Sequence, residues 1–236
     1  MHEIPRIYSP EAAVGKQISL TQDQQRHLKV IKLATNSKIR LFDGNGREFE
    51  GVYEGKVRAW QVHVELEISP QKEPQIPITL AIATPKGARM DFLVEKVSEL
   101  GVAEIIPINC ARSIVNPRDT KIDRLQRIAI AACEQSKRAK VPKIHTQTTF
   151  DLLLQQAQKY QLAFICHKTG KPLPFAIKSE TLIIVGPEGD FTPEELEKAQ
   201  KVGCTTISLG PTTLRTETAG IAAVAQIISK TLEKSE

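Results

Sequence analysis

The sequence has few of the residues from which metal sites and disulfide frameworks are built. Its 236 residues include four cysteines and five histidines, with no CxxC pair and no cluster of histidines. The cysteines lie far apart among apolar or small residues: Cys110, Cys133, Cys166 and Cys204. We therefore expect four reduced thiols in the core, no bound metal and no disulfide scaffold.

The signatures of membrane proteins and of common nucleotide-binding proteins are missing as well. No stretch approaches the roughly 18 consecutive apolar residues of a membrane-spanning helix, and residues 1–10 have no apolar run behind a basic head. These absences predict a cytoplasmic protein without a membrane partner. Neither GxGxxG nor GxxxxGK followed by serine or threonine occurs, which disfavours a dinucleotide or ATP as ligand.

What is present is an ordinary globular composition with an uneven distribution of charge. The chain is 41% hydrophobic and 25% charged, and its net charge is +5. Residues 112–143 contain nine basic and three acidic residues, so this stretch alone is more positive than the whole chain. Such an excess is typical of a surface that binds the phosphate backbone of a nucleic acid, although a solvated helix face has the same composition. The basic residues of this stretch are Arg112, Arg118, Lys121, Arg124, Arg127, Lys137, Arg138, Lys140 and Lys143.

The amino-terminal part of the chain has the pattern of short strands joined by turns. Residues 38–42 and 61–68 alternate between apolar and polar side chains, and Asp43-Gly44-Asn45-Gly46 is a strong turn signal. These features predict a small β-barrel. Three prolines then fall within residues 69–77, where they discourage both a helix and a central strand.

We therefore place a domain boundary there, with one domain at residues 1–72 and a second at residues 73–236. In the second domain, short buried-type strands alternate with helical segments, which predicts an α/β domain with a mainly parallel sheet. The expected strands are residues 78–83, 103–108, 162–166, 181–185 and 205–209.

Four helices of this domain have clear signals. In the first, Met90, Leu93, Val97 and Leu100 fall at helical spacing before Gly101. From Ile122 onward the apolar residues form one stripe, which leaves Lys121, Arg124 and Arg127 on another face. Residues 192–203 begin with a capping box of Thr192 and Glu195 and end at a glycine. The last helix begins at about Thr216.

Ligands of open α/β sheets bind beyond the carboxyl ends of the strands, so the loops after residues 185 and 209 are the places to search. The first loop reads Gly-Pro-Glu-Gly-Asp-Phe at residues 186–191, and its glycines allow close approach of the backbone to a ligand. The second, residues 210–219, enters a helix whose free N–H groups suit a carboxylate or phosphate. Taken singly, each loop is equally typical of a structural turn or a helix cap.

Taken together, GPEGDFTPEE and LGPTTLRTETA closely resemble the paired carboxyl-terminal motifs of RsmE proteins in the SPOUT methyltransferase superfamily. Similar stretches at residues 85–91, 99–102 and 134–142, at Arg112-Ser113, and in the amino-terminal part at residues 27–33 and 41–46 extend the resemblance over essentially the whole chain. The resemblance implies a SPOUT-type α/β domain with a C-terminal trefoil knot, preceded by a small PUA-like β-barrel. It also implies a homodimer whose active site is completed by the second subunit.

The function that the resemblance implies is S-adenosylmethionine-dependent methylation of N3 of a uridine in 16S ribosomal RNA of the small ribosomal subunit. The chain departs from the family at Thr212 and Thr213, where arginine and a branched aliphatic residue are usual, at Lys32, usually arginine, and at Asn36, usually glycine. Loss of a guanidinium at position 212 removes a bidentate contact. Two alternatives therefore stay open: a catalytically silent rRNA-binding assembly factor, and a SPOUT methyltransferase acting on a ribose 2′-hydroxyl.

The resemblance and the loop chemistry together predict specific site residues. Arg215 is expected to stabilise negative charge on the uracil oxygens or to hold a phosphate, and Glu217 to receive the N3 proton or to orient Arg215. Aromatic residues are only 5% of the chain, so RNA contacts are expected through phosphates rather than base stacking. The S-adenosylmethionine site is predicted at Val185, Gly186, Glu188, Gly189, Leu209, Gly210, Leu214 and Thr216. The RNA contacts are predicted at Lys86, Arg89, Arg112, Arg124, Arg127 and Arg138.

Overall fold

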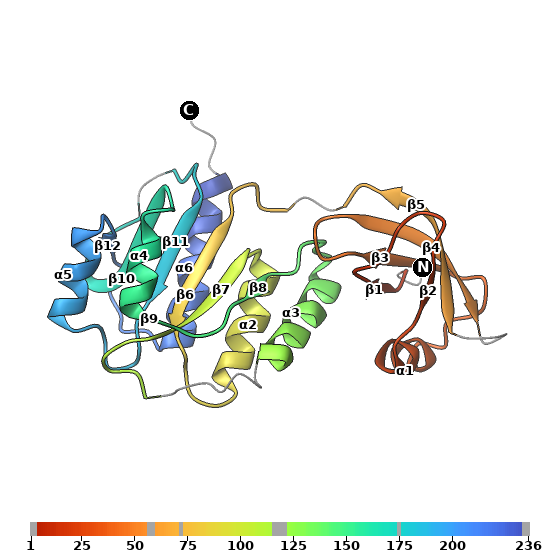
Figure 1. Cartoon of the computed structure of the whole chain (residues 1–236), viewed down its shortest axis with the longest axis horizontal. Helices are drawn as coiled ribbons and strands as arrows, with labels where there is room; N and C mark the ends of the chain where they lie inside the picture. Colours follow the sequence, from red (N-terminus) through yellow and green to blue (C-terminus); the bar gives the residue numbers. More distant parts are fainter. Residues whose placement is uncertain (1–3, 56–59, 71–72, 115–121, 174–175, 233–236) are drawn as a thin grey trace. The chain divides into compact units, whose positions relative to one another are not determined.

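The computed structural model describes residues 4–55, 60–70, 73–114, 122–173 and 176–232, so the predicted basic residues Arg118 and Lys121 lie outside the described part. The chain forms two compact units (Figure 1). The first comprises Met1–Glu73 together with Cys133–Val141, and the second comprises Pro74–Ala132 and Pro142–Glu236. The sequence analysis assigned residues 133–141 to the second domain, whereas in the structure they belong to the first unit.

The first unit is built on a five-stranded sheet in the order β1-β3-β4-β5-β2. The predicted strands at residues 38–42 and 61–68 are confirmed as β3 and β5, which pair antiparallel with β4 on either side. The sheet curls, which fits a small barrel, and its inner face carries fully buried side chains such as Ile39, Leu41 and Val62. The strands are β1 (Arg6–Tyr8), β2 (Gln17–Ser19), β3 (Lys38–Phe42), β4 (Glu48–Gly55) and β5 (Gln61–Ile68).

One helix, α1 (Gln22–Val30), belongs to this unit and begins with a capping box of Thr21 and Gln24. The turn that follows contains Asn36 with a φ of 65°. This left-handed conformation is easy for glycine and tolerated by asparagine, so the replacement of the family's glycine is accommodated here.

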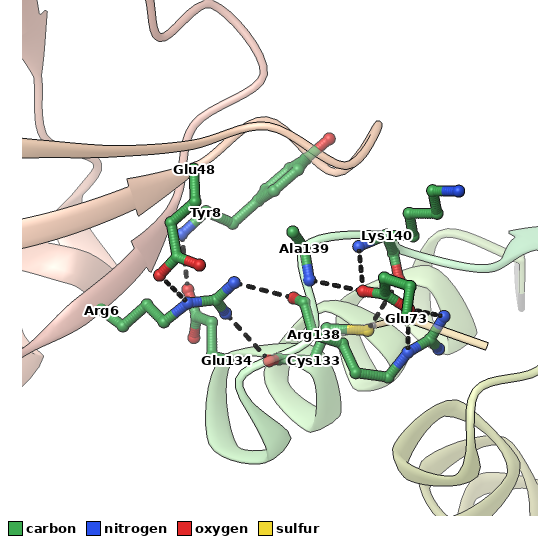
Figure 2. Close-up of polar contacts among 9 residues, drawn as sticks. All are labelled: Arg6, Tyr8, Glu48, Glu73, Cys133, Glu134, Arg138, Ala139 and Lys140. Carbon is green, nitrogen blue, oxygen red and sulfur yellow. Dashed lines mark hydrogen bonds and ion pairs between the residues drawn. The ribbon is translucent and has the colours of Figure 1, made fainter. Parts of the chain in front are cut away.

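Residues 133–141 are held in the first unit by buried polar contacts (Figure 2). Arg6 donates from Nε to Glu48 Oε1 at 2.9 Å, from Nη1 to the Cys133 carbonyl at 3.0 Å and from Nη2 to the Arg138 carbonyl at 2.9 Å. The Tyr8 backbone N–H donates to Glu134 Oε1 at 2.8 Å. Burial raises the pKa of the Glu134 carboxyl above its usual value.

Glu73 holds the same segment through both of its carboxylate oxygens (Figure 2). Its Oε2 accepts from Nε of Arg138 at 2.9 Å, and its Oε1 accepts from the backbone N–H groups of Ala139 at 2.7 Å and Lys140 at 2.9 Å. The Arg138 side chain is only 9% exposed. Arg138 is therefore buried in an ion pair within the first unit, an arrangement that does not favour its predicted contact with an RNA phosphate.

The second unit contains a parallel sheet in the order β12-β10-β11-β6-β7-β8, with β9 paired to β7. The predicted α/β domain with a mainly parallel sheet is thus confirmed. β10 continues further than expected, past a bulge, and β12 ends earlier than expected. The strands are β6 (Ile78–Ala83), β7 (Glu104–Asn109), β8 (Lys143–Ile144), β9 (Thr148–Thr149), β10 (Leu162–Lys171), β11 (Thr181–Val185) and β12 (Thr205–Ile207).

Helices cover both faces of this sheet (Figure 1). On one face, Ala81 and Leu182 share a core cluster with residues of α4 and α5. On the other face lie α2 and α6, and a Cβ added to Gly220 of α6 would meet Ile82 at 2.7 Å and Leu93 of α2 at 2.9 Å. Only glycine allows α6 to approach the sheet this closely. The helices are α2 (Arg89–Leu100), α3 (Ile122–Ser136), α4 (Phe150–Ala157), α5 (Pro193–Lys201) and α6 (Thr216–Leu232).

The helix signals of the sequence are confirmed in detail. In α3, Leu125, Ala129 and Ala132 are buried, while Arg124 and Arg127 are exposed. Helix α5 has both halves of the predicted capping box, with proline in its first turn. The helix α4 and the short strands β8 and β9 were not predicted.

The four cysteines are unpaired, and three of them are buried. Burial raises the pKa of the thiols of Cys110 and Cys166 to about 12 and of Cys133 and Cys204 to about 11. Within the described ranges, no helix combines the length and the apolar character needed to cross a bilayer. In the same ranges, no three His, Cys, Asp or Glu side chains are placed to hold a metal ion.

Candidate functional site

The candidate site lies in the second unit, where three neighbouring parallel strands end. In the sheet, Val185 pairs with Ile82, and Ala83 pairs with Ile108. The carboxyl ends of β11, β6 and β7 therefore lie at one edge of the sheet. The segments that follow these strands surround a pocket together with the start of α6. The pocket is lined by Thr84, Pro85, Lys86, Arg112, Ile114, Pro187, Glu188 and Thr216.

The loop after β11 contains the first group of predicted cofactor residues. Its turn is closed by a hydrogen bond from the Asp190 N–H to the Pro187 carbonyl at 2.9 Å. Arg112 Nη1 donates to the Gly189 carbonyl at 2.8 Å, and a Cβ on Gly189 would lie 3.2 Å from the Arg112 Cβ. The segment after β7 therefore packs directly on this loop, and glycine permits the contact. Val185, the last residue of β11, is buried beneath it.

The amino-terminal end of α6 lies beside this loop. The hydroxyl of Thr216 donates to the Gly186 carbonyl at 3.2 Å, and Thr216 is only 4% exposed. The next residue, Glu217, is 7% exposed, and its Oε2 has no hydrogen-bond partner among the described residues. A buried carboxylate oxygen without a partner is costly unless a ligand or water satisfies it. The first turn of a helix favours such a negative charge.

Arg89 joins the two acidic residues of the site. At the start of α2, its guanidinium forms an ion pair with Glu188 of the loop after β11, and its Nε lies 3.7 Å from Oε1 of Glu217. One cation thus faces both the predicted cofactor loop and the predicted catalytic carboxylate. Arg89, which was predicted as an RNA contact, lies between these two carboxylates in the structure.

The second predicted cofactor loop follows β12. The Ser208 N–H donates to the Lys171 carbonyl at 2.8 Å, and Gln226 of α6 donates to the Leu209 carbonyl at 3.0 Å. Gly210, Leu214 and Arg215 follow but do not line the pocket. Arg215 is exposed, and its guanidinium makes no hydrogen bond or ion pair with any described residue, although its backbone carbonyl accepts from the Ala219 N–H at 2.8 Å.

The exposed guanidinium of Arg215 therefore remains available to an external anion. Thr212 and Thr213 are also exposed.

The remaining predicted RNA contacts are exposed around the site and on α3. Lys86 lines the pocket and is exposed, as is Arg112. Arg124 forms an ion pair with Asp91 of α2, and Arg127 donates to the carbonyl of Asp123 one turn earlier at 3.4 Å.

Four lining residues were not among the predicted site residues: Pro85 and Pro187, which lie within the family-like stretches, and Thr84 and Ile114, which do not. Thr84 directly follows β6, and its hydroxyl oxygen is buried without a hydrogen-bond partner among the described residues. Ile114 follows β7 and is 70% exposed. The rule that ligands bind at the carboxyl ends of strands points to both, but it was applied only to the ends of β11 and β12.

A ligand in this pocket would meet both unsatisfied polar atoms and an apolar wall. The Thr84 hydroxyl, which has no partner among the described residues, and the N–H groups that the first turn of a helix leaves outside its own hydrogen bonds suit a ligand with acceptor atoms. Pro85, Pro187 and Ile114 supply apolar surface. These features fit a mixed polar and apolar organic cofactor better than a simple anion.

Comparison with known proteins decides the family. A model of the RNA methyltransferase domain matches residues 71–228, which is more than half of the chain. The ribosomal RNA small subunit methyltransferase E of Synechocystis sp. is 30% identical over 94% of this chain and 76% of its own length. The chain belongs to the RsmE family.

Two further RsmE relatives match over more than 90% of both chains, one in sequence and one in structure. The Rickettsia conorii RsmE is 32% identical over 94% of both chains. The crystal structure of the Neisseria gonorrhoeae RsmE, which is bound to S-adenosylmethionine, superposes with a TM-score of 0.87. It is 33% identical and covers 96% of this chain and 98% of its own.

Proposed function

We propose that this RsmE protein transfers a methyl group from S-adenosylmethionine to N3 of a uridine in 16S ribosomal RNA. One observation carries the proposal: Arg89 forms ion pairs with both Glu188 and Glu217, beside a pocket at the carboxyl ends of β6 and β11. Family membership and the S-adenosylmethionine-bound relative support the choice of cofactor.

When bound, S-adenosylmethionine supplies an electrophilic methyl group on a sulfonium. The unpartnered hydroxyl of Thr84 and the donors at the start of α6 fit its polar groups. Glu188 offers a carboxylate for its ammonium group. The residues proposed to hold it are Val185, Gly186, Glu188, Gly189, Leu209, Gly210, Leu214 and Thr216.

Proton removal is the chain's own chemical task, because N3 of uridine is protonated at neutral pH. Glu217 is the proposed acceptor, since its Oε2 is buried and unsatisfied among the described residues. Arg89, 3.7 Å away, fixes the orientation of this carboxylate. Arg215 is exposed, its guanidinium has no partner among the described residues, and it stabilises negative charge on the uracil oxygens or holds a phosphate.

RNA phosphates are proposed to contact Lys86 and Arg112 around the pocket, and Arg124 and Arg127 on α3. All four are exposed, as phosphate contacts require. The proposal further includes a PUA-like barrel that binds RNA, a trefoil knot around the cofactor, a homodimer that completes the site, and a cytoplasmic location. The curled sheet of the first unit supports the barrel.

The test is methyl transfer from labelled S-adenosylmethionine to 16S rRNA and to small ribosomal subunits, with cofactor binding measured by calorimetry. Glu217→Gln and Arg215→Ala should each abolish transfer while the affinity for S-adenosylmethionine stays within a few-fold of the parent. Folded protein that binds rRNA but not the cofactor would instead support the silent assembly factor, for which the exposed Thr212 and Thr213 are the best argument.

A further inference from the structure

The strand β10 lies between β11 and β12 in the sheet, so its carboxyl-terminal part is flanked by both predicted cofactor loops. Pairing of β10 with β12 is interrupted between Cys166 and Lys171, both of which align with Ile207. Residues 167–170 therefore bulge from the ladder at the level where the two loops begin. Bulges of this kind often re-aim a side chain beside a functional site.

His167, the first residue of the bulge, contacts the loop after β11. Its Nε2 lies 3.2 Å from Oδ2 of Asp190, and its side chain is only 9% exposed. Its Nδ1 accepts from the backbone N–H of Thr169 at 3.3 Å and lies 2.7 Å from the Thr169 hydroxyl. With Nδ1 facing the N–H and hydroxyl of Thr169, Nε2 is the ring nitrogen that contacts the Asp190 carboxylate.

Asp190 is the residue on which the shape of that loop depends. Its φ is 64°, its N–H closes the turn on Pro187, and its Oδ1 accepts from the Phe191 N–H at 2.9 Å. A Cβ on Gly186 would lie 2.8 Å from the ring of Phe191, so this ring fixes the start of the loop as well.

The other end of the bulge contacts the second loop. The Lys171 carbonyl accepts from the Ser208 N–H, and Gly170 lies so close to the backbone of Ile207 that a Cβ would meet it at 2.3 Å. From these contacts we propose that His167 is a positioning residue that holds the loop of residues 186–191 in its cofactor-binding shape, and that residues 167–171 tie this loop to the one after β12. The part of this inference that concerns the cofactor rests on the proposed function.

The test compares His167→Ala with a matched control, His145→Ala. His145 also pairs with a carboxylate in the second unit, with Nε2 2.6 Å from Glu104 Oε2. It directly follows β8 and is not part of either predicted cofactor loop. In the ligand-free protein, His167→Ala should speed hydrogen exchange of the Asp190 and Phe191 amides by about tenfold, and His145→Ala should leave them unchanged. The dissociation constant and the KM for S-adenosylmethionine should also rise about tenfold, with kcat at saturating cofactor and the KM for RNA unchanged.

Two further variants guard against a folding defect. His167→Gln retains a hydrogen-bond donor in place of Nε2 and should restore slow exchange of the two amides. Asp190→Asn alters the more exposed partner of the pair and should speed this exchange as His167→Ala does. Unchanged exchange in His167→Ala and Asp190→Asn, or equal effects from His145→Ala, would overturn the inference. If the parent protein does not bind S-adenosylmethionine, the proposed function fails, whereas the exchange data still decide the role of His167.

Discussion

Glu73→Ala should destabilise the first unit far more than removal of an exposed carboxylate. Glu73 accepts three hydrogen bonds, from Nε of Arg138 at 2.9 Å and from the N–H groups of Ala139 and Lys140, and its Oε2 also forms an ion pair with Nη2 of Arg138 at 2.9 Å. The Glu73 and Arg138 side chains are 11% and 9% exposed. Breaking a buried ion pair on one side costs about 3–5 kcal/mol, because the remaining charge stays in a poorly solvated place.

The single tryptophan of the chain allows this unit to be followed by itself. Trp60 belongs to the first unit, packs against its core and lies 5.8 Å from the ring of Tyr53. Urea unfolding followed by Trp60 fluorescence should show the midpoint of Glu73→Ala lowered by at least about 1.5 M, since a loss of about 3–5 kcal/mol is divided by a urea dependence of about 1–2 kcal/mol per molar.

The matched control is Glu67→Ala. Glu67 pairs with Arg47 at 2.6 Å in the same unit, but the two side chains are 46% and 53% exposed, so solvent screens the pair and its loss should hardly move the midpoint. Equal midpoints for Glu73→Ala and Glu67→Ala would refute the argument that Glu73 and Arg138 stabilise the unit.

Three further predictions concern the second unit and the thiols. Arg89→Met should weaken S-adenosylmethionine binding and slow turnover by at least about tenfold, since it frees two carboxylates; Lys96→Met on the same helix is the control, and equal losses would contradict this role. Arg127→Ala should lower the slope of log K for RNA binding against log salt concentration by about one, the value expected for one lost phosphate contact. An unchanged slope would show that Arg127 does not contact an RNA phosphate. Because burial raises the pKa of every thiol to about 11 or 12, labelling by a disulfide reagent at pH 8 should be roughly a hundredfold slower in the native protein than in denaturant; one rapidly labelled thiol would contradict the burial.

Much of the second unit follows from local patterns in the sequence. The buried strands β6 and β11 are continuous apolar runs, and α5 has a capping box, so their bounds could be predicted almost to the residue. The strands β8 and β9 have two residues each and carry no periodicity, which explains why they were missed.

The role of Arg138 could not be predicted from charge counting. Its carboxylate partner, Glu73, is 65 positions away in sequence, and only the fold shows that the guanidinium is buried. The same limit applies to Arg89 and His167, whose partners Glu188 and Asp190 are distant in sequence. Basic residues in a functional stretch can therefore be structural, and burial of the paired guanidinium is what separates the two cases: the Arg138 side chain is 9% exposed, whereas that of Arg124, also ion-paired, is 63% exposed.

The central claim is most directly tested by identifying the methylated nucleoside. Small ribosomal subunits lacking the modification would be incubated with the protein and S-adenosylmethionine, and the 16S rRNA digested and analysed by mass spectrometry, with Glu217→Gln as the inactive control. The account predicts 3-methyluridine at a single position. A ribose-methylated nucleoside, another methylated base, or bound but unmodified RNA would contradict it.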